Sequence, residues 1–156
     1  MTSGATGQLY GSGWLWQFKP GWEGHVDTQG TREFKLMTEL FRSSRWYDLV
    51  PDQDHKLLTS GYGTPNVWGS VNDNDYATAA RTADGRLAML YLPTSRSVTV
   101  DLSTMRPGAI AFWYDPTNGS YRLANPPVGR GQVTFTPPGR NHGGDDDWVL
   151  RIAAFG

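Results

Sequence analysis

Residues 77–92 read ATAARTADGRLAMLYL, with strand-forming segments on either side of Asp84 and Gly85. An Asp-Gly pair between two such segments is typical of a β-hairpin with a two-residue loop, in which both loop residues have positive φ angles. The run 87–92 is apolar without interruption, which favours a strand covered on both faces. The stretch therefore predicts an antiparallel hairpin whose second strand is central in a sheet.

The other residues after Pro51 show the same pattern of short strands and turns. In SVTVDL (97–102), Val98, Val100 and Leu102 alternate with polar residues. Further strands are predicted in KLLTS (56–60), AIAFWYD (109–115), SYRL (120–123), GQVTFT (131–136) and WVLRIAAF (148–155), with a turn at 116–119. About seven or eight short strands predict a mainly β fold, an antiparallel β-sandwich over residues 52–154. We expect these side chains to be mostly buried: Leu87, Met89, Leu90, Val100, Phe112, Phe135, Leu150 and Ile152.

One helix is predicted before this region. Residues 31–41 (TREFKLMTELF) place Phe34, Met37, Leu40 and Phe41 at helical spacing. We expect Gly30 as the N-cap and an end at Ser43–Ser44. The pattern divides the chain into residues 1–50 and a β-sandwich domain over 51–156.

Composition excludes several functions. The chain has 156 residues, a formal net charge of -1 and no cysteine, so we expect no nucleic-acid partner, no membrane partner and no thiol chemistry. His25, His55 and His142 lie in different segments, which argues against a zinc site. Catalytic and phosphate-binding motifs are absent. We expect no cofactor, no metal and no catalytic residue, and the N-terminus shows no targeting signal.

The stretch GRNHGGDDDWVLRI (139–152) places three aspartates directly before the last strand. Successive side chains of an extended segment point to opposite faces, so at most two of these acids can converge on one centre. The pattern predicts a solvated loop from His142 to Asp147 that leads into a strand at Trp148. Calcium held by loops of different strands stays open as an alternative.

Tryptophans supply the candidate binding residues. The segment GSGWLWQFKPGWEG (11–24) gathers Trp14, Trp16 and Trp22 among glycines; such rings either fill a core or stack on the apolar faces of sugars. Trp68 and Trp113 are further candidates, together with Tyr121. A module that binds a flat polymer should expose a row of these rings, whereas a structural support should bury them.

Longer motifs carry a resemblance to a known family. GQLYGSGWLWQF (7–18), GWEGHVDTQGTREFKLMTELF (21–41) and RWYDLVPD (45–52) resemble the end of a glycosidase-like (β/α)8 barrel in a bacterial family that includes apiosidase-type glycoside hydrolases. The motifs DYATAARTADGRLAMLYLPTSRSVTVDL (75–102), AIAFWYDPTNGSY (109–121) and DDDWVLRI (145–152) resemble the domain that follows this barrel, catalogued as "putative collagen-binding domain of a collagenase". Gln8 departs from the pattern, which often has histidine there.

The resemblance implies a strand-loop-helix remnant of the last barrel unit followed by a sandwich. The remnant consists of a strand over 7–10, the tryptophan loop and the helix. The catalytic acids of such a barrel lie on strands outside this chain, so the chain is expected to be a non-catalytic accessory domain of a glycoside hydrolase that is secreted or periplasmic. It would bind a polysaccharide or, by the catalogue name, collagen. Alternatives are a structural buttress of the catalytic barrel, and a fragment that retains part of a glycosidase cleft. The N-terminal part should pack back onto the sandwich or self-associate through residues 1–45.

Overall fold

The computed structural model describes residues 1–65, 74–125 and 129–154. One α-helix, α1 (Gln29–Arg42), lies between two 3-10 helices, η1 (Trp22–His25) and η2 (Trp46–Asp48). Nine strands are described: β1 (Leu49–Pro51), β2 (Leu58–Ser60), β3 (Thr78–Thr82), β4 (Leu87–Leu92), β5 (Val98–Asp101), β6 (Ala109–Tyr114), β7 (Tyr121–Leu123), β8 (Gln132–Phe135) and β9 (Trp148–Ala154). None of the helices in these ranges is long and apolar enough to span a bilayer.

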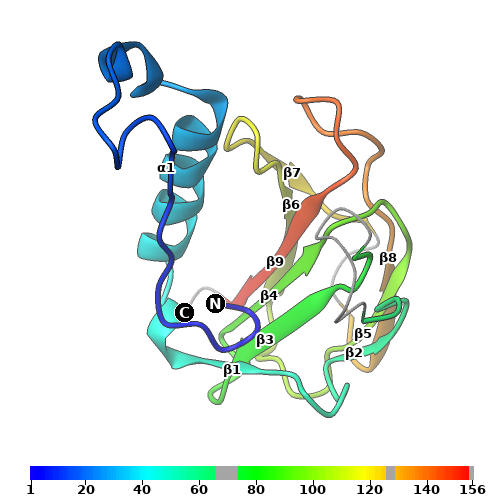
Figure 1. Cartoon of the computed structure of the whole chain (residues 1–156). Coiled ribbons are helices and arrows are strands. Elements are labelled where there is room, and N and C mark those ends of the chain that lie inside the picture. Colours follow the sequence, from blue (N-terminus) through cyan, green and yellow to red (C-terminus); the bar gives the residue numbers. More distant parts are fainter. Residues whose placement is uncertain (66–73, 126–128, 155–156) are drawn as a thin grey trace.

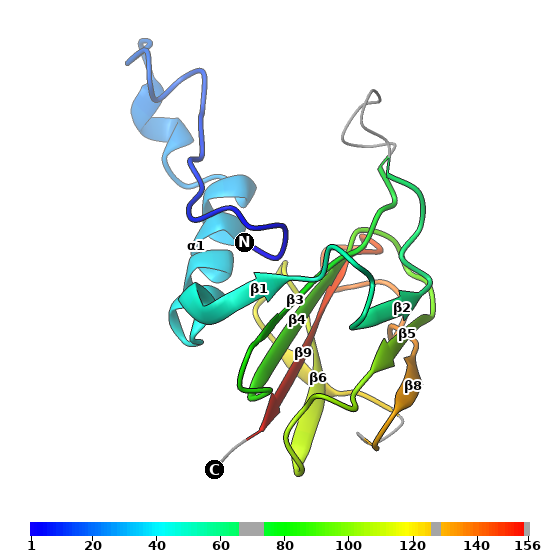
Figure 2. The same cartoon turned by 90° about the horizontal axis from the view of Figure 1, so that it is seen from below.

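The elements form three layers. A six-stranded antiparallel sheet, in the order β1-β3-β4-β9-β6-β7, faces a three-stranded sheet, β2-β5-β8, and α1 lies on the other side of the larger sheet (Figures 1 and 2). The two sheets form the predicted β-sandwich. Its main core lies between them and is supplied by the inward-facing side chains of both, including Leu90, Val100, Phe135, Leu150 and Ile152.

Eight of the nine strands lie in segments that the sequence predicts as strands. The strand that the sequence did not predict, β1, has three residues and pairs with β3 at the edge of the larger sheet. It ends at Pro51, which is tolerated there because an edge strand leaves some backbone N–H groups without a ladder partner. A three-residue strand with a proline carries too little alternation to be found from sequence. β1 also crosses the predicted division of the chain at residue 50.

Seven of the eight side chains that were predicted to be mostly buried are fully buried, whereas Phe112 is only partly buried. In β6, Ala109, Ala111 and Trp113 point into the sandwich core, so Phe112 points to the outer face of the sheet. Because side chains alternate along a strand, an error of one residue in register exchanges the two faces. AIAFWYD has apolar residues on both faces, and the sequence therefore did not fix its orientation.

The β3–β4 hairpin forms as predicted, but its turn differs from the predicted one. The N–H of Gly85 donates to the carbonyl of Thr82 at 3.1 Å, and Gly85 has a φ of 68°, whereas Asp84 has no positive φ. This is the geometry of a type I turn followed by one left-handed residue, which is the usual longer hairpin loop. A Cβ at Gly85 would lie 2.3 Å from the carbonyl oxygen of Thr104, so this position requires glycine.

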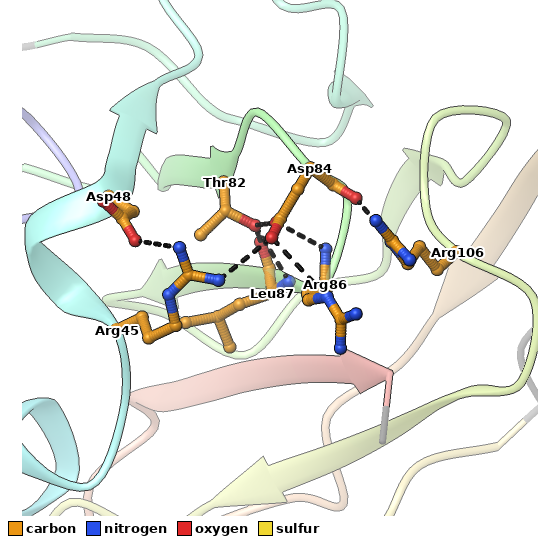
Figure 3. Close-up of polar contacts among 7 residues, drawn as sticks. All are labelled: Arg45, Asp48, Thr82, Asp84, Arg86, Leu87 and Arg106. Carbon is orange, nitrogen blue, oxygen red and sulfur yellow. Dashed lines mark hydrogen bonds and ion pairs between the residues drawn. The ribbon is translucent and has the colours of Figure 1, made fainter. Parts of the chain in front are cut away.

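Asp84 joins this hairpin to the segment that follows α1. Its carboxylate accepts hydrogen bonds from the hydroxyl of Thr82 at 2.6 Å and from the backbone N–H of Arg86 at 3.1 Å (Figure 3). The guanidinium of Arg45 donates to the same carboxylate at 3.0 Å and pairs with Asp48. These donors hold the pKa of Asp84 at about 2, below its usual value of 3.8, with the Thr82 hydroxyl as the largest cause.

We expect Asp84→Asn to lower the melting temperature at neutral pH and to have little effect near pH 2. The folded-state pKa is depressed, so the contribution of the carboxylate is fully present above pH 3.8 and is lost as the pH falls towards about 2. Melting curves of both proteins between pH 2 and 7 measure this difference. Asp54→Asn is the control, because Asp54 contacts only the exposed Lys56 among the ion pairs in the described ranges. A difference that persists unchanged at pH 2 would contradict the assignment.

The helix α1 begins two residues earlier than predicted. Thr28, and not Gly30, is the N-cap: its side chain accepts from the N–H of Thr31, while the Thr31 hydroxyl accepts from the N–H of Thr28. This reciprocal pair satisfies two backbone donors that a glycine would leave to solvent. The C-cap is Ser43, as predicted.

α1 packs back onto the sandwich, which is one of the two arrangements expected for the N-terminal part. Leu40 lies in a second apolar cluster with Leu87, Met89, Tyr114 and Ala153 on the outer face of the larger sheet. The hydroxyl of Tyr114 donates to the carbonyl of Leu36 at 3.0 Å, and burial raises the pKa of Tyr114 to about 12. The helix therefore covers the outer face of β4, β9 and part of β6.

The predicted strand over residues 7–10 is wrong. These residues pair with no strand and instead run beside α1 (Figure 1). The ring of Tyr10 lies 5.9 Å from that of Phe34, and its hydroxyl is 3.4 Å from that of Thr28. A Cβ on Gly30 would lie 2.5 Å from the Tyr10 hydroxyl, which shows how closely the segment approaches the helix. Strand pairing needs a neighbouring strand with free backbone groups, and this side of α1 offers none in the described ranges.

Candidate functional site

Two regions outside the core carry candidate functional residues. The first is the aromatic loop, residues 11–26, which contains the predicted Trp14, Trp16 and Trp22. It extends beyond the N-terminal end of α1, away from the sandwich (Figure 1, blue). Trp16 is 69% exposed and Phe18 is 71% exposed, whereas Trp22 is partly buried. The structure thus brings the three predicted tryptophans into one projecting loop.

Ring contacts give the aromatic loop its shape. The Trp14 ring stacks on His25 with centroids 4.3 Å apart and a 10° angle between planes, and the Lys19 ammonium lies 5.7 Å from the Trp14 centroid. Phe18 meets Trp22 edge to face at 5.6 Å. Phe18 also has a φ of 47°, which is strained for a bulky residue. Trp14 and Trp22 therefore have ring partners within the loop, although Trp14 is still 44% exposed, and Trp16 is the most exposed of the three indoles.

The other two predicted tryptophans do not join this loop. Trp113 is 2% exposed and packs in the sandwich core, 6.4 Å from the ring of Trp148. Its ring is covered by both sheets, so it has no face open to a ligand in this structure. Trp68 lies outside the described residues. Tyr121 is exposed on the edge strand β7.

The second region is the α1 cleft, a space of about 560 Å³ between α1, the N-terminal segment and the outer face of the larger sheet. The sequence did not predict it, because its walls come from segments more than a hundred residues apart. No local pattern signals such a cleft. Its lining includes the N-terminal Met1 and these polar and aromatic residues: Thr2, Gln8, Tyr10, Glu33, Phe34, Tyr91, Tyr114, Thr117, Asp145 and Asp147.

The acidic loop before β9 forms one edge of the α1 cleft. β9 begins at Trp148, as predicted, but Asp147 is partly buried and not fully solvated. Its carboxylate accepts from the side-chain amide of Asn141 at 2.7 Å and from the hydroxyl of Tyr91 at 3.2 Å. Asn141 also accepts from the N–H of Asp145 at 2.9 Å, which closes the loop into a turn.

Burial is the main cause that raises the pKa of Asp147, and the charges of Asp145 and Glu33 act in the same direction. Burial, with the charge of Asp147, also raises the pKa of Tyr91, so its hydroxyl stays protonated at neutral pH. His142 is exposed, and its backbone N–H donates to the carboxylate of Asp115 at 2.7 Å. Within the described ranges, no group of three or more His, Asp or Glu side chains is arranged to hold a metal ion.

Comparison with known proteins gives a family match. The model of the family described as "Putative collagen-binding domain of a collagenase" matches residues 66–153. No curated protein matches the sequence. These residues include most of the sandwich strands but not α1 or the aromatic loop.

Two solved structures with a similar fold are described as glycoside hydrolases. One, described as "Glycoside hydrolase", is 23% identical with a TM-score of 0.63, and the match covers 85% of this chain and 27% of that chain. A glycoside hydrolase family 5 structure from Bacteroides vulgatus ATCC 8482 is 21% identical with a TM-score of 0.63, and the match covers 87% of this chain and 27% of that chain. At this identity the likeness shows the fold. This chain spans 27% of the length of both structures.

Proposed function

The chain belongs to the family described as "Putative collagen-binding domain of a collagenase", and on this premise we propose that it is a non-catalytic accessory domain of a larger glycoside-hydrolase-like protein. The match to 27% of two glycoside hydrolase chains supports this role. The larger protein would be secreted or periplasmic and would carry the catalytic acids on its barrel. The chain itself would bind a polymer without cleaving it.

The aromatic loop is the proposed binding surface. The observation that supports it is the exposure of Trp16 and Phe18 on a loop that extends away from the sandwich. Burying large apolar side chains on binding is favourable, and aromatic rings stack on the apolar faces of sugar rings. Trp14, held against His25, would extend the surface. We therefore propose a carbohydrate polymer as the ligand. Collagen is a candidate ligand only through the family description, and it is included in the same binding test.

We expect Trp16→Ala and Phe18→Ala each to weaken polysaccharide binding about tenfold, the loss typical of an aromatic anchor at an interface. Affinity electrophoresis and pull-down with insoluble plant polysaccharides and fibrillar collagen measure the binding, and analysis of released sugars should show no hydrolysis. Tyr47→Ala is the matched control, because Tyr47 is also 69% exposed but lies in η2, outside the aromatic loop.

If Trp16→Ala, Phe18→Ala and Tyr47→Ala weaken polymer binding equally, exposed aromatic rings bind the polymer without a specific site. If the wild-type chain binds no polymer, the structural buttress becomes the better function. The burial of Trp113 favours that second candidate, because a binding row across the sheet would leave the ring exposed. Hydrolysis by the purified chain would contradict both functions.

A further inference from the structure

The α1 cleft collects negative charge from two separate parts of the chain. Glu33 comes from α1, and Asp145 and Asp147 come from the loop before β9. All three carboxylates line the same cleft, and the charges of Asp145 and Glu33 add to burial in raising the pKa of Asp147. Asp147 is fixed by Tyr91 and Asn141.

None of these three carboxylates has a salt-bridge partner in the described ranges, although Met1, whose α-ammonium is partly buried, also lines the cleft. The ion pairs formed in those ranges include neither Glu33 nor Asp145 nor Asp147. The side-chain amide of Gln29 donates to Glu33 at 2.8 Å, which leaves the charge of Glu33 in place. Carboxylates that line a cleft with low-dielectric walls concentrate positively charged ligands there.

Aromatic rings form the other part of the lining. Tyr10 and Phe34, with centroids 5.9 Å apart, stand on the side of the helix, and Tyr91 and Tyr114 stand on the side of the sheet. Aromatic faces attract cations, and the attraction is strongest where the cation loses its water. The volume of about 560 Å³ lies within the range of small-molecule sites.

We propose that the α1 cleft binds an alkylammonium group, with Glu33, Asp145 and Asp147 as counter-charges and the aromatic rings around its carbon atoms. Two sources offer this chemistry: an amino sugar and a lysine side chain. The residues that line the cleft lie outside the aromatic loop. The chain passes directly from Tyr10, which lines the cleft, into this loop. The proposal therefore stands independently of polymer binding by Trp16 and Phe18.

Isothermal titration calorimetry with two amines and their neutral counterparts tests the proposal. The probes are glucosamine against N-acetylglucosamine, and Nα-acetyl-lysine methylamide against its Nε-acetylated form. We expect saturable binding of at least one amine, at least about tenfold tighter than its neutral counterpart, because acetylation removes the charge. Which amine binds identifies the source.

Three isosteric variants locate the site. Glu33→Gln and Asp145→Asn are each expected to weaken binding about five- to tenfold, because each removes one counter-charge from the cleft. Asp146→Asn removes the same charge from the same loop, but Asp146 does not line the cleft, so binding should stay within about twofold. Asp147 is left unchanged because it holds Asn141 and Tyr91.

Melting curves verify that each variant is folded, and Asp145 is exposed, so its replacement should leave the fold intact. Absence of saturable binding of both amines would overturn the proposal. Equal affinity for the neutral counterparts would also overturn it. An equal loss in Asp146→Asn would show a diffuse negative surface in place of a site.

Discussion

Trp113→Ala is expected to destabilise the protein by roughly 3–5 kcal/mol, the loss typical of truncating a buried aromatic side chain. Trp113 is 2% exposed, lies between the two sheets and packs edge to face on Trp148. Its removal leaves a cavity next to β9, the central strand that pairs with β6. Because the core is closely packed, the side chains around this cavity cannot move far enough to fill it. Urea unfolding followed by circular dichroism measures the loss.

Trp16→Ala is the control for the same chemical change at an exposed position. Because Trp16 is 69% exposed, its truncation should alter the free energy of unfolding by no more than about 0.5 kcal/mol. Comparison of Trp113→Ala with Trp16→Ala distinguishes the two roles that the sequence left open for the tryptophans, core packing and ligand binding. A loss below about 1 kcal/mol in Trp113→Ala would contradict the burial of this ring in the core.

Leu40→Ala is expected to cost roughly 2–5 kcal/mol, the range for buried leucines. Leu40 is 3% exposed and joins α1 to Leu87 and Met89 on the outer face of the sheet. If α1 is an integral layer of the fold, the loss should appear in one cooperative transition of the whole domain. Thermal unfolding, followed by both helix and tryptophan signals, measures it.

Leu9→Ala provides the comparison, because Leu9 is 93% exposed in the segment that runs beside α1. Its truncation should change the free energy of unfolding by no more than about 0.5 kcal/mol. Two separate transitions in the wild-type protein, with Leu40→Ala affecting only the first, would show that α1 docks on an independently stable sandwich. That result would support the predicted division near residue 50.

The strands of the sandwich were determined by the sequence itself wherever the alternation was unambiguous. In 97–102 one face is apolar and the other is polar, and in 148–152 the large apolar residues Trp148, Leu150 and Ile152 share one face, opposite Arg151, so the pattern specifies which face is buried in the sandwich. A hairpin at Asp84–Gly85 also followed from sequence, because the glycine is needed for a left-handed residue. The turn type was not predicted from sequence: only Gly85 has a positive φ, while the carboxylate of Asp84 accepts hydrogen bonds from Thr82 and Arg45.

The orientation of β6 was decided only by tertiary structure. Its apolar residues occupy both faces, and the side that received Trp113 depended on pairing with β9. Met89 and Tyr114 are buried on the outer face only because α1 covers them. The sequence predicted that the helix would need a partner, but it did not identify the surface.

The functional regions divide in the same way. The aromatic loop is a local cluster, so its tryptophans were found from nine neighbouring residues, although their exposure was not. The α1 cleft could not be found from sequence, because Glu33 and Asp147 are 114 positions apart in the chain and meet only when α1 docks beside the loop before β9. Local pattern determines the identity of an element and its apolar face; electrostatic environment depends on distances in space, which the packing of distant segments decides.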